Sequence, residues 1–196
     1  KGNILDKEKV ESAIKNIDIV IHLAGNTGVE TSLDNPYIDL LNNIVGTLNI
    51  LDISKNNKIK KLIFSSSNAV IGVTRRRITE NLKTNPSNPY GVSKLSAESY
   101  IKVFSKIYGI PSIILRFGNV YGPGSKNKTS IIPKFIKKMK NNEVCYIYGD
   151  GEQTRDFIYV DDLIDAIYKS INYRIKNSEI FQISGGKQTT IKKLSH

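Results

Sequence analysis

Strand-like and helix-like segments alternate along this chain of 196 residues, and this alternation constrains its fold more than any other feature. Residues 18–23 form a short apolar, β-branched run, which is typical of a strand buried in a parallel sheet. Asn35-Pro36 then begins a helical pattern of apolar residues that continues to Leu51. Because repeated strand–helix units build parallel sheets covered by helices, we predict a doubly wound α/β fold.

The same two patterns continue along the chain, less regularly after residue 118. Pro89 begins another helix and Gly109 ends it, with strands expected on either side at residues 61–65 and 112–117. A Gly/Pro loop at residues 121–125, a lysine-rich helix and a short strand at residues 144–148 are expected next. Residues 156–160, 161–171 and 181–183 are predicted as strand, helix and strand.

Composition excludes several classes of protein. The longest apolar run, around residues 17–24, is too short to span a bilayer, and residues 1–6 lack the apolar segment of a signal peptide. Cys145 is the single cysteine, so neither a disulfide framework nor a cysteine-based metal site is expected. His22 lies in a buried-looking strand, and we interpret it as a packed structural residue. We therefore expect a cytoplasmic protein without a metal.

The formal net charge of +11 permits two interpretations. A strongly basic chain can bind nucleic acid. Alternatively, the lysines lie on solvated helix faces, as Lys134, Lys137 and Lys138 do around Ile136 and Met139. No helix-turn-helix, zinc-finger or RNA-binding motif accompanies the charge, so we predict no nucleic-acid partner. A positive surface would still attract an anionic diphosphate substrate.

Tyr90 and Lys94 are the most informative pair for function. They lie four residues apart at the start of a predicted helix, so both side chains project from one face. A nearby cation favours the phenolate, and we therefore expect Lys94 to lower the pKa of Tyr90 toward the range of a working base. The preceding predicted strand ends in Ser65-Ser66-Ser67, whose hydroxyls could contact a substrate oxygen.

Small or polar residues follow three predicted strands, at Gly25, at Ser65 to Ser67 and at residues 117–119. In open parallel sheets, ligands bind at the carboxyl ends of the strands. The three segments therefore favour one common crevice. The alternative is that small residues simply suit tight strand–helix turns.

Several sequence blocks, in a fixed order, resemble the extended short-chain dehydrogenase/reductases of the NAD-dependent epimerase/dehydratase family, and nucleotide-sugar 4-epimerases in particular. The resemblance covers essentially the whole chain. The blocks are Ile21-His22-Leu23-Ala24-Gly25, Asn35-Pro36, Asn43 with Gly46-Thr47, Phe64 to Ser67, Pro89-Tyr90 with Lys94, Leu115-Arg116 with Asn119 to Pro123, Gly149-Asp150-Gly151, Arg155-Asp156-Phe157 and Val160-Asp161-Asp162.

The resemblance implies NAD as cofactor, a nucleotide sugar as substrate, and three groups of site residues. The catalytic residues would be Ser67, Tyr90 and Lys94. The residues bordering NAD would be Asn3, Ile4, Leu23, Ala24, Gly25, Thr27, Asn43, Ser65, Tyr90, Lys94 and Phe117. The residues contacting the nucleotide sugar would be Ser67, Asn119, Ser130, Ile131, Tyr146, Tyr148 and Arg155. Arg155 suits phosphate recognition because guanidinium offers paired donors, although an ion pair with Asp156 or Asp161 is an equal alternative.

The family begins with a strand and a glycine-rich turn that binds the cofactor pyrophosphate, and no G-x-x-G-x-x-G occurs here. We therefore interpret the chain as a fragment that lacks the first half of the Rossmann-like fold and the end of the substrate region. We assign residues 1–118 and 155–183 to the NAD-binding core. Residues 119–154 and 184–196 are assigned to a partial sugar-nucleotide-binding region.

The residues after Ser67 bear on the reaction. Dehydratases of the family carry an Asp-Glu pair there, whereas this chain has Asn68 and Ala69, which cannot transfer a proton. The resemblance therefore favours a UDP-hexose 4-epimerase, in which Tyr90 takes the proton of the carbon-4 hydroxyl during a transient oxidation.

Three alternatives stay open at this point: a nucleotide-sugar reductase or decarboxylase, a fragment without activity, and a binding domain that has kept only the fold. The resemblance also implies a homodimer of the full-length protein, formed through the helices at residues 35–55 and 90–107.

Overall fold

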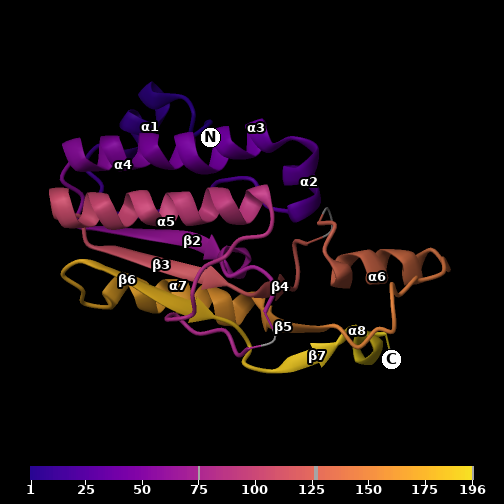
Figure 1. Cartoon of the computed structure of the whole chain (residues 1–196). Coiled ribbons are helices and arrows are strands. Elements are labelled where there is room, and N and C mark those ends of the chain that lie inside the picture. The colour runs from indigo at the N-terminus through magenta and orange to yellow at the C-terminus, as the bar shows by residue number, and fades with distance from the viewer. Residues whose placement is uncertain (75, 126–127, 196) are drawn as a thin grey trace. The chain divides into compact units, whose positions relative to one another are not determined.

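A four-stranded sheet with the order β1-β2-β3-β6 forms the centre of the first of two compact units (Figure 1). The computed structural model describes residues 1–74, 76–125 and 128–195. Unit 1 comprises Lys1–Arg116 and Ile167–Gln182, and unit 2 comprises Phe117–Ala166 and Ile183–His196. The strands are β1 (Ile19–His22), β2 (Lys61–Ser67), β3 (Ser112–Phe117) and β6 (Ser178–Ile183). β1 pairs with β2 in parallel, as predicted, with Ile19 opposite Lys61 and His22 opposite Phe64.

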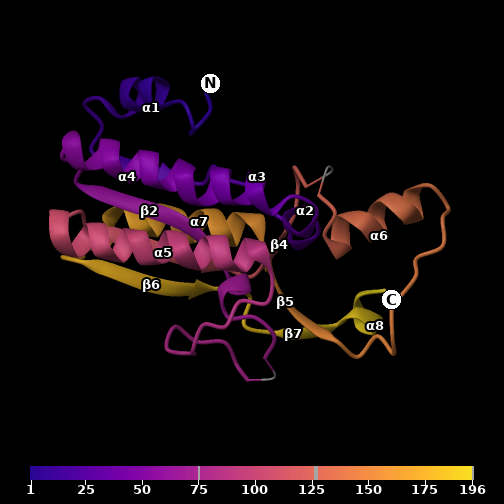
Figure 2. The same ribbon diagram turned by 45° about the horizontal axis from the view of Figure 1, so that its top comes forward.

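Helices α4 (Gly46–Asn56) and α5 (Pro89–Tyr108) lie side by side along one face of this sheet, with α1 (Lys7–Ile14) against α4 (Figures 1 and 2). Two shorter helices, α2 (Val29–Asp34) and α3 (Pro36–Leu40), precede α4. The core between helices and sheet is aliphatic and includes Leu51, Leu62, Ile101 and Ile114, each fully buried. Burial of these side chains stabilises unit 1 and fixes α5 above β2.

The sequence sets the position of α5 through its two ends. The Asn88 side chain accepts a hydrogen bond from the Gly91 amide at 2.9 Å, and Pro89 fills the first turn, where no amide donor is needed. Gly109 ends the helix with φ at 67°, a conformation that costs glycine little. Tyr90 and Lys94 are therefore placed in the first two turns, where the sequence predicts them.

The first part of the run from α3 to α4 buries polar residues in place of the apolar ones that the pattern suggests. Asp39, Asn43 and Thr47, spaced four residues apart, are buried, whereas the apolar Ile38 is exposed. A π-helical turn, η1 (Leu41–Val45), separates α3 from α4 and carries Asn43. Such a turn inserts an extra residue into a helix and is frequent at functional sites.

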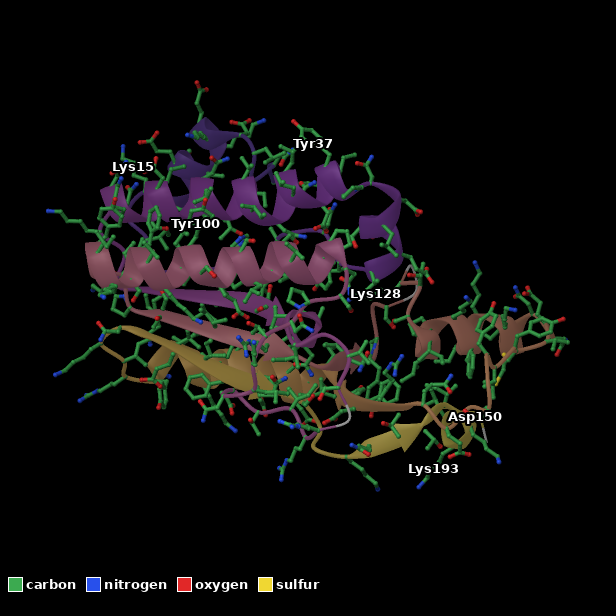
Figure 3. The ribbon with its side chains drawn as sticks, viewed as in Figure 1. Lys15, Tyr37, Tyr100, Lys128, Asp150 and Lys193 are labelled. Carbon is green, nitrogen blue, oxygen red and sulfur yellow. The ribbon has the colours of Figure 1, made fainter. Side chains whose placement is uncertain are left out.

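Helices α3 and α5 both carry large apolar side chains on their solvent-exposed surfaces. Tyr37, on α3, and Tyr100, on α5, both lie on the surface (Figure 3). The other exposed apolar residues of α3 and α5 are Ile38, Leu40, Val92, Val103, Ile107 and Tyr108. The apolar pattern therefore identifies the helical segments and part of their buried face, such as Leu51 and Ile101, but not the exposure of Ile38 and Tyr100.

Unit 2 contains a three-stranded sheet with the order β4-β5-β7, formed by Asn119–Tyr121, Thr154–Tyr159 and Gln188–Thr190. β4 and β5 are parallel, and β7 is antiparallel to β5. Its helices are α6 (Ile131–Lys140), α8 (Ile191–Leu194) and the first part of α7 (Val160–Asn172), whose last turns belong to unit 1. Unit 2 includes residues 155–166, which the sequence assigned to the core.

The strand predicted at residues 144–148 is wrong, because these residues form no strand. This segment resembles a half-buried strand in its alternation of more and less exposed residues. Its large side chains Val144, Tyr146 and Tyr148 are all largely exposed. No helix of the described residues is both long enough and apolar enough to cross a membrane.

Candidate functional site

The carboxyl end of β2 holds three consecutive serines with three different tasks. Ser65 donates from its hydroxyl to the carbonyl of His22 at 3.2 Å, which ties β2 to β1. Ser66 is buried and donates to Glu98 Oε1 at 2.6 Å. Ser67 is half-buried and accepts from the Ala69 amide at 3.1 Å, which starts the 3₁₀ turn η2 (Asn68–Val70). Of the three hydroxyls, that of Ser67 is therefore the best placed to meet a ligand.

Tyr90 and Lys94 of α5 lie directly against this strand end. Tyr90 is half-buried, and its phenol lies close enough to the Ser67 side chain for that hydroxyl to lower the pKa of the phenol. The Lys94 ammonium is buried and donates to the Ser65 carbonyl at 2.9 Å. It lies 4.8 Å from the centre of the Phe64 ring and 6.0 Å from the centre of the Tyr90 ring. The structure thus brings Ser65, Ser67, Tyr90 and Lys94 together, as the sequence predicts.

The expected effect of Lys94 on Tyr90 is wrong for this structure. Burial raises the pKa of the Tyr90 phenol above its ordinary value, and the charge of Asp39 acts in the same direction. The Ser67 hydroxyl opposes this rise. Burial also lowers the pKa of Lys94 to about 8. The physical reason is that both groups lose water, and Lys94 directs its ammonium to a carbonyl and the Phe64 ring rather than to the phenol.

Asn43 joins this group from the π-helical turn. Its amide nitrogen donates to Asp39 Oδ1 at 2.9 Å and to Ser93 Oγ at 3.2 Å. Its amide oxygen is buried without a hydrogen-bond partner among the described residues. A Cβ atom on Gly25 would lie 2.5 Å from that oxygen and 3.7 Å from Lys94 Nζ, so only glycine permits this approach. The space beside the Gly25 backbone, just after β1, is therefore bordered by Asn43 and Lys94.

Glu98 and Arg116 form a buried ion pair under the site that the sequence argument did not identify. Arg116, on β3, binds both carboxylate oxygens of Glu98 at 2.9 and 2.7 Å, and Ser66 shares one of them. Tyr90, Lys94 and Glu98 follow one another at spacings of four residues, so they lie along one face of α5. The i, i+4, i+8 spacing of these polar residues is the signal that could have found Glu98.

His22 is a packed residue, as interpreted from the sequence. Its Nε2 lies 3.0 Å from Thr47 Oγ1, and its ring lies 5.4 Å from that of Phe64. Burial lowers the pKa of His22 to about 3, with a smaller contribution from the Lys94 charge. The imidazole is therefore neutral at physiological pH.

The other predicted cofactor residues of unit 1 lie outside this hydrogen-bonded cluster. Leu23, Ala24 and Thr27 are exposed after β1. Asn3 uses its side-chain oxygen to accept from the Leu5 amide at 3.0 Å in the turn before α1. Ile4 packs against Gly46 of α4, and its carbonyl accepts from Asn49 at 3.1 Å.

Apart from Ser67, which is in unit 1, the predicted nucleotide-sugar residues belong to unit 2, as does Phe117. Asn119 donates to the Asp156 carbonyl at 3.0 Å, and Arg155 donates to the Thr154 carbonyl at 2.8 Å. Ser130 precedes α6, and Ile131 begins it. Tyr146, with Lys138 Nζ 5.2 Å from its ring centre, and Tyr148 are exposed.

The two described cavities lie elsewhere in their units. A cavity of about 820 Å³ lies before the amino ends of β2, β3 and β6, beside Lys61 and Pro111, at the strand ends opposite Ser67. A cavity of about 390 Å³ in unit 2 is lined by Tyr121, Ile132, Phe157 and four further residues, which include none of the predicted substrate residues. Neither cavity therefore identifies the site, which the Ser67–Tyr90–Lys94 geometry defines better.

Comparison with known proteins gives the family. The model of the NAD dependent epimerase/dehydratase family matches residues 1–184. A Methanocaldococcus jannaschii protein with the provisional name UDP-glucose 4-epimerase is 40% identical over 198 aligned residues, covering 98% of this chain and 64% of that protein. The dTDP-D-glucose 4,6-dehydratase of Dictyostelium discoideum is 39% identical, covering 85% of this chain and 41% of that protein.

A solved structure agrees. The UDP-N-acetylglucosamine 4-epimerase of Methanobrevibacter ruminantium M1, in complex with UDP-N-acetylmuramic acid, is 39% identical, with a TM-score of 0.93 over 100% of this chain and 63% of that one. The chain thus spans less than two thirds of the length of these relatives. The sequence blocks, the parallel sheet and the matched residues together place this chain in the NAD-dependent epimerase/dehydratase family.

Proposed function

We propose that the chain carries the catalytic groups of an NAD-dependent nucleotide-sugar 4-epimerase, with a UDP-hexose as substrate. The observation that carries the proposal is the contact of the Tyr90 phenol with Ser67, one helical turn from the buried Lys94. A proton-transferring phenol, a hydroxyl and a nearby cation are the groups that oxidation of a sugar alcohol requires.

The residues of unit 1 fit NAD, the cofactor of the family. The buried amide oxygen of Asn43 has no partner among the described residues, and the missing side chain of Gly25 leaves room beside Lys94. Asn43, Ser65 and Lys94 would hold the nicotinamide half. When bound, NAD⁺ would supply the acceptor for the hydride of the sugar carbon and a cationic ring that would favour the phenolate of Tyr90.

Tyr90 and Ser67 would handle the proton. Tyr90 takes the proton of the carbon-4 hydroxyl as the carbon–hydrogen bond breaks, and the hydroxyl oxygen becomes a carbonyl. Ser67 orients that oxygen through its hydroxyl. The keto sugar then rotates in the site so that its opposite face receives the hydride, and Tyr90 returns the proton to the oxygen. The reaction therefore has no net change in redox state.

Epimerisation is favoured over dehydration by the residues after Ser67. Asn68 accepts a hydrogen bond from Gln182 Nε2, and Ala69 has no functional side chain. A dehydratase must protonate a leaving hydroxyl, and neither residue can do so. Dehydration is nevertheless the second candidate, because the Dictyostelium dehydratase, at 39% identity, is almost as similar to this chain as the Methanocaldococcus protein, at 40%.

The test uses the complete gene product that contains this chain. Wild type is expected to interconvert UDP-glucose and UDP-galactose, or their N-acetyl or uronic forms, without consuming NAD. Tyr90→Phe is expected to lower kcat by at least about 100-fold, the lower range for positioned acid–base groups. Tyr100→Phe, on the exposed side of the same helix, is the matched control.

Mass spectrometry of the products distinguishes the candidates. A product of unchanged mass indicates epimerisation, and loss of one water indicates dehydration. Stoichiometric use of NADPH would instead reveal a reductase, and loss of carbon dioxide a decarboxylase. Normal turnover by Tyr90→Phe would refute the assignment of Tyr90.

The outward apolar side chains of α3 and α5 support a second proposal, a homodimer formed through these helices. Exposed aromatic and aliphatic residues on neighbouring helices, as α3 and α5 are, can form a protein interface. Tyr100→Glu is expected to shift the sedimentation coefficient from that of a dimer to that of a monomer, whereas Tyr146→Glu in unit 2 is not.

A further inference from the structure

A buried carboxylate that the proposed chemistry does not use lies beside the site. Asp39 is only 2% exposed. Its Oδ1 accepts from Asn43 at 2.9 Å, and its Oδ2 has no hydrogen-bond partner among the described residues. Burial of a carboxylate is costly unless a cation or several donors compensate its charge. One neutral amide does not supply that charge.

A buried cation that likewise has no oppositely charged hydrogen-bond partner among the described residues lies in the same cluster. Lys94 is 3% exposed, and its ammonium donates to the Ser65 carbonyl, which is neutral. Asn43 connects the two groups. Its nitrogen contacts Asp39, and its oxygen and the Lys94 ammonium both border the space that a Gly25 side chain would occupy.

We propose that Asp39 is a positioning residue whose buried carboxylate is the counter-charge that keeps Lys94 in its ammonium form beside the cofactor. Asn43 holds the carboxylate in place by its hydrogen bond. Asp39 touches neither reacting atom, so it acts through Lys94. The inference rests on the proposed function, because it gives the charge of Lys94 a catalytic purpose.

The other ionisable groups around Lys94 do not supply this charge. His22, from β1, is neutral because burial lowers its pKa to about 3. Tyr90, from α5, is held neutral by its burial. Glu98, one turn further along α5, is already paired with Arg116 at 2.7 Å. β2 contributes serines and the Phe64 ring, which carry no charge.

The charge of Lys94 is sensitive to such a partner. Burial lowers its pKa to about 8, and Asp39 acts against that fall. A pKa near 8 leaves roughly ten ammonium groups for each amine at pH 7. If Asp39 is neutralised and the pKa drops by about one pH unit, the two forms become about equal at that pH.

The test follows Lys94 directly by NMR of the side-chain Cε in protein labelled with ¹³C-lysine. The Lys94 signal is assigned by its loss in Lys94→Met. Asp39→Asn keeps the size of the side chain and removes the charge. Asp52→Asn, which removes the surface carboxylate paired with Lys55 at 2.8 Å, is the matched control.

In wild type and Asp52→Asn we expect a Lys94 midpoint near pH 8, and in Asp39→Asn a midpoint lower by about one pH unit. Asp39→Glu, which keeps the negative charge, should bring the Lys94 midpoint back close to its wild-type value. Asp39→Ser is the second neutral variant if Asp39→Asn does not fold, as judged by urea unfolding.

A folded neutral variant with an unchanged Lys94 midpoint would overturn the proposal and leave Asp39 with a purely structural role. The titration requires no turnover. Its failure therefore differs from failure of the epimerase assignment, which the Tyr90→Phe assay decides separately.

Discussion

At the scale of single residues, the site shows how burial sets protonation. His22 is buried with its Nε2 against Thr47 and its pKa lowered to about 3, from an ordinary value of 6.5. The unfolded chain therefore binds a proton at His22 below pH 6.5, whereas the folded chain does not until about pH 3. The free energy of unfolding must fall as the pH drops through this window.

We expect His22 to account for a loss of about 2 kcal/mol between pH 7.5 and pH 5.0. His22→Gln, which keeps a donor for Thr47, should lack that part of the pH dependence. Urea unfolding of both proteins at several pH values measures it. Parallel curves for the two proteins would contradict the assigned shift.

The same scale shows which site residues the sequence could predict. The spacing of Tyr90 and Lys94 and the serines at the end of β2 identified a cluster that the structure assembles. The pKa of Tyr90 could not be predicted, because it depends on how much water the fold removes from the phenol. Asp39 was missed because an acidic residue in a helix ordinarily faces solvent.

At the scale of elements, the position of α5 on the sheet depends on a buried polar network. Arg116 of β3 binds Glu98 of α5 through two bonds, and Ser66 of β2 donates to the same carboxylate. Both charged side chains are almost completely buried. Removing one partner would leave the other charge in an apolar environment without compensation.

Glu98→Gln is therefore expected to lower the free energy of unfolding by about 3–5 kcal/mol. Asp18→Asn, which breaks the exposed pair with Lys60 at 3.0 Å, should cost at most about 1 kcal/mol. Chemical denaturation of the three proteins gives the comparison. If Glu98→Gln costs no more than Asp18→Asn, the network does not hold α5.

Helix ends were predictable where local chemistry decides them, whereas the buried faces were predictable only in part, as at Leu51 and Ile101. Asn88, Pro89 and Gly109 fix the ends of α5 within its own sequence. The buried face of the α3–α4 run depends on the π-helical turn and on polar partners from other elements, such as Ser93. Residues 144–148 have the alternation of a strand, but a strand also needs a neighbour to pair with, which local sequence does not reveal.

At the scale of the whole molecule, the two proposed ligands are assigned to different units. The cluster proposed for NAD, which includes Asn43, Ser65 and Lys94, belongs to unit 1. Most residues proposed for the nucleotide sugar, among them Tyr146 and Arg155, belong to unit 2. A bound ligand slows hydrogen exchange most at the backbone amides of the segments that it contacts, because it opposes their local unfolding. Each ligand should therefore protect a different set of amides.

Hydrogen exchange followed by mass spectrometry measures these patterns on the complete gene product. NAD alone is expected to slow exchange at the end of β2 and in the first turns of α5, and to leave α6 unchanged. Adding UDP-glucose should then slow exchange around residues 146–155. Lys94→Met is expected to lose the NAD effect while exchange in unit 2 stays as in wild type. NAD protection confined to unit 2 would reverse the assignment, because Asn43, Ser65 and Lys94 would then have no part in holding the cofactor.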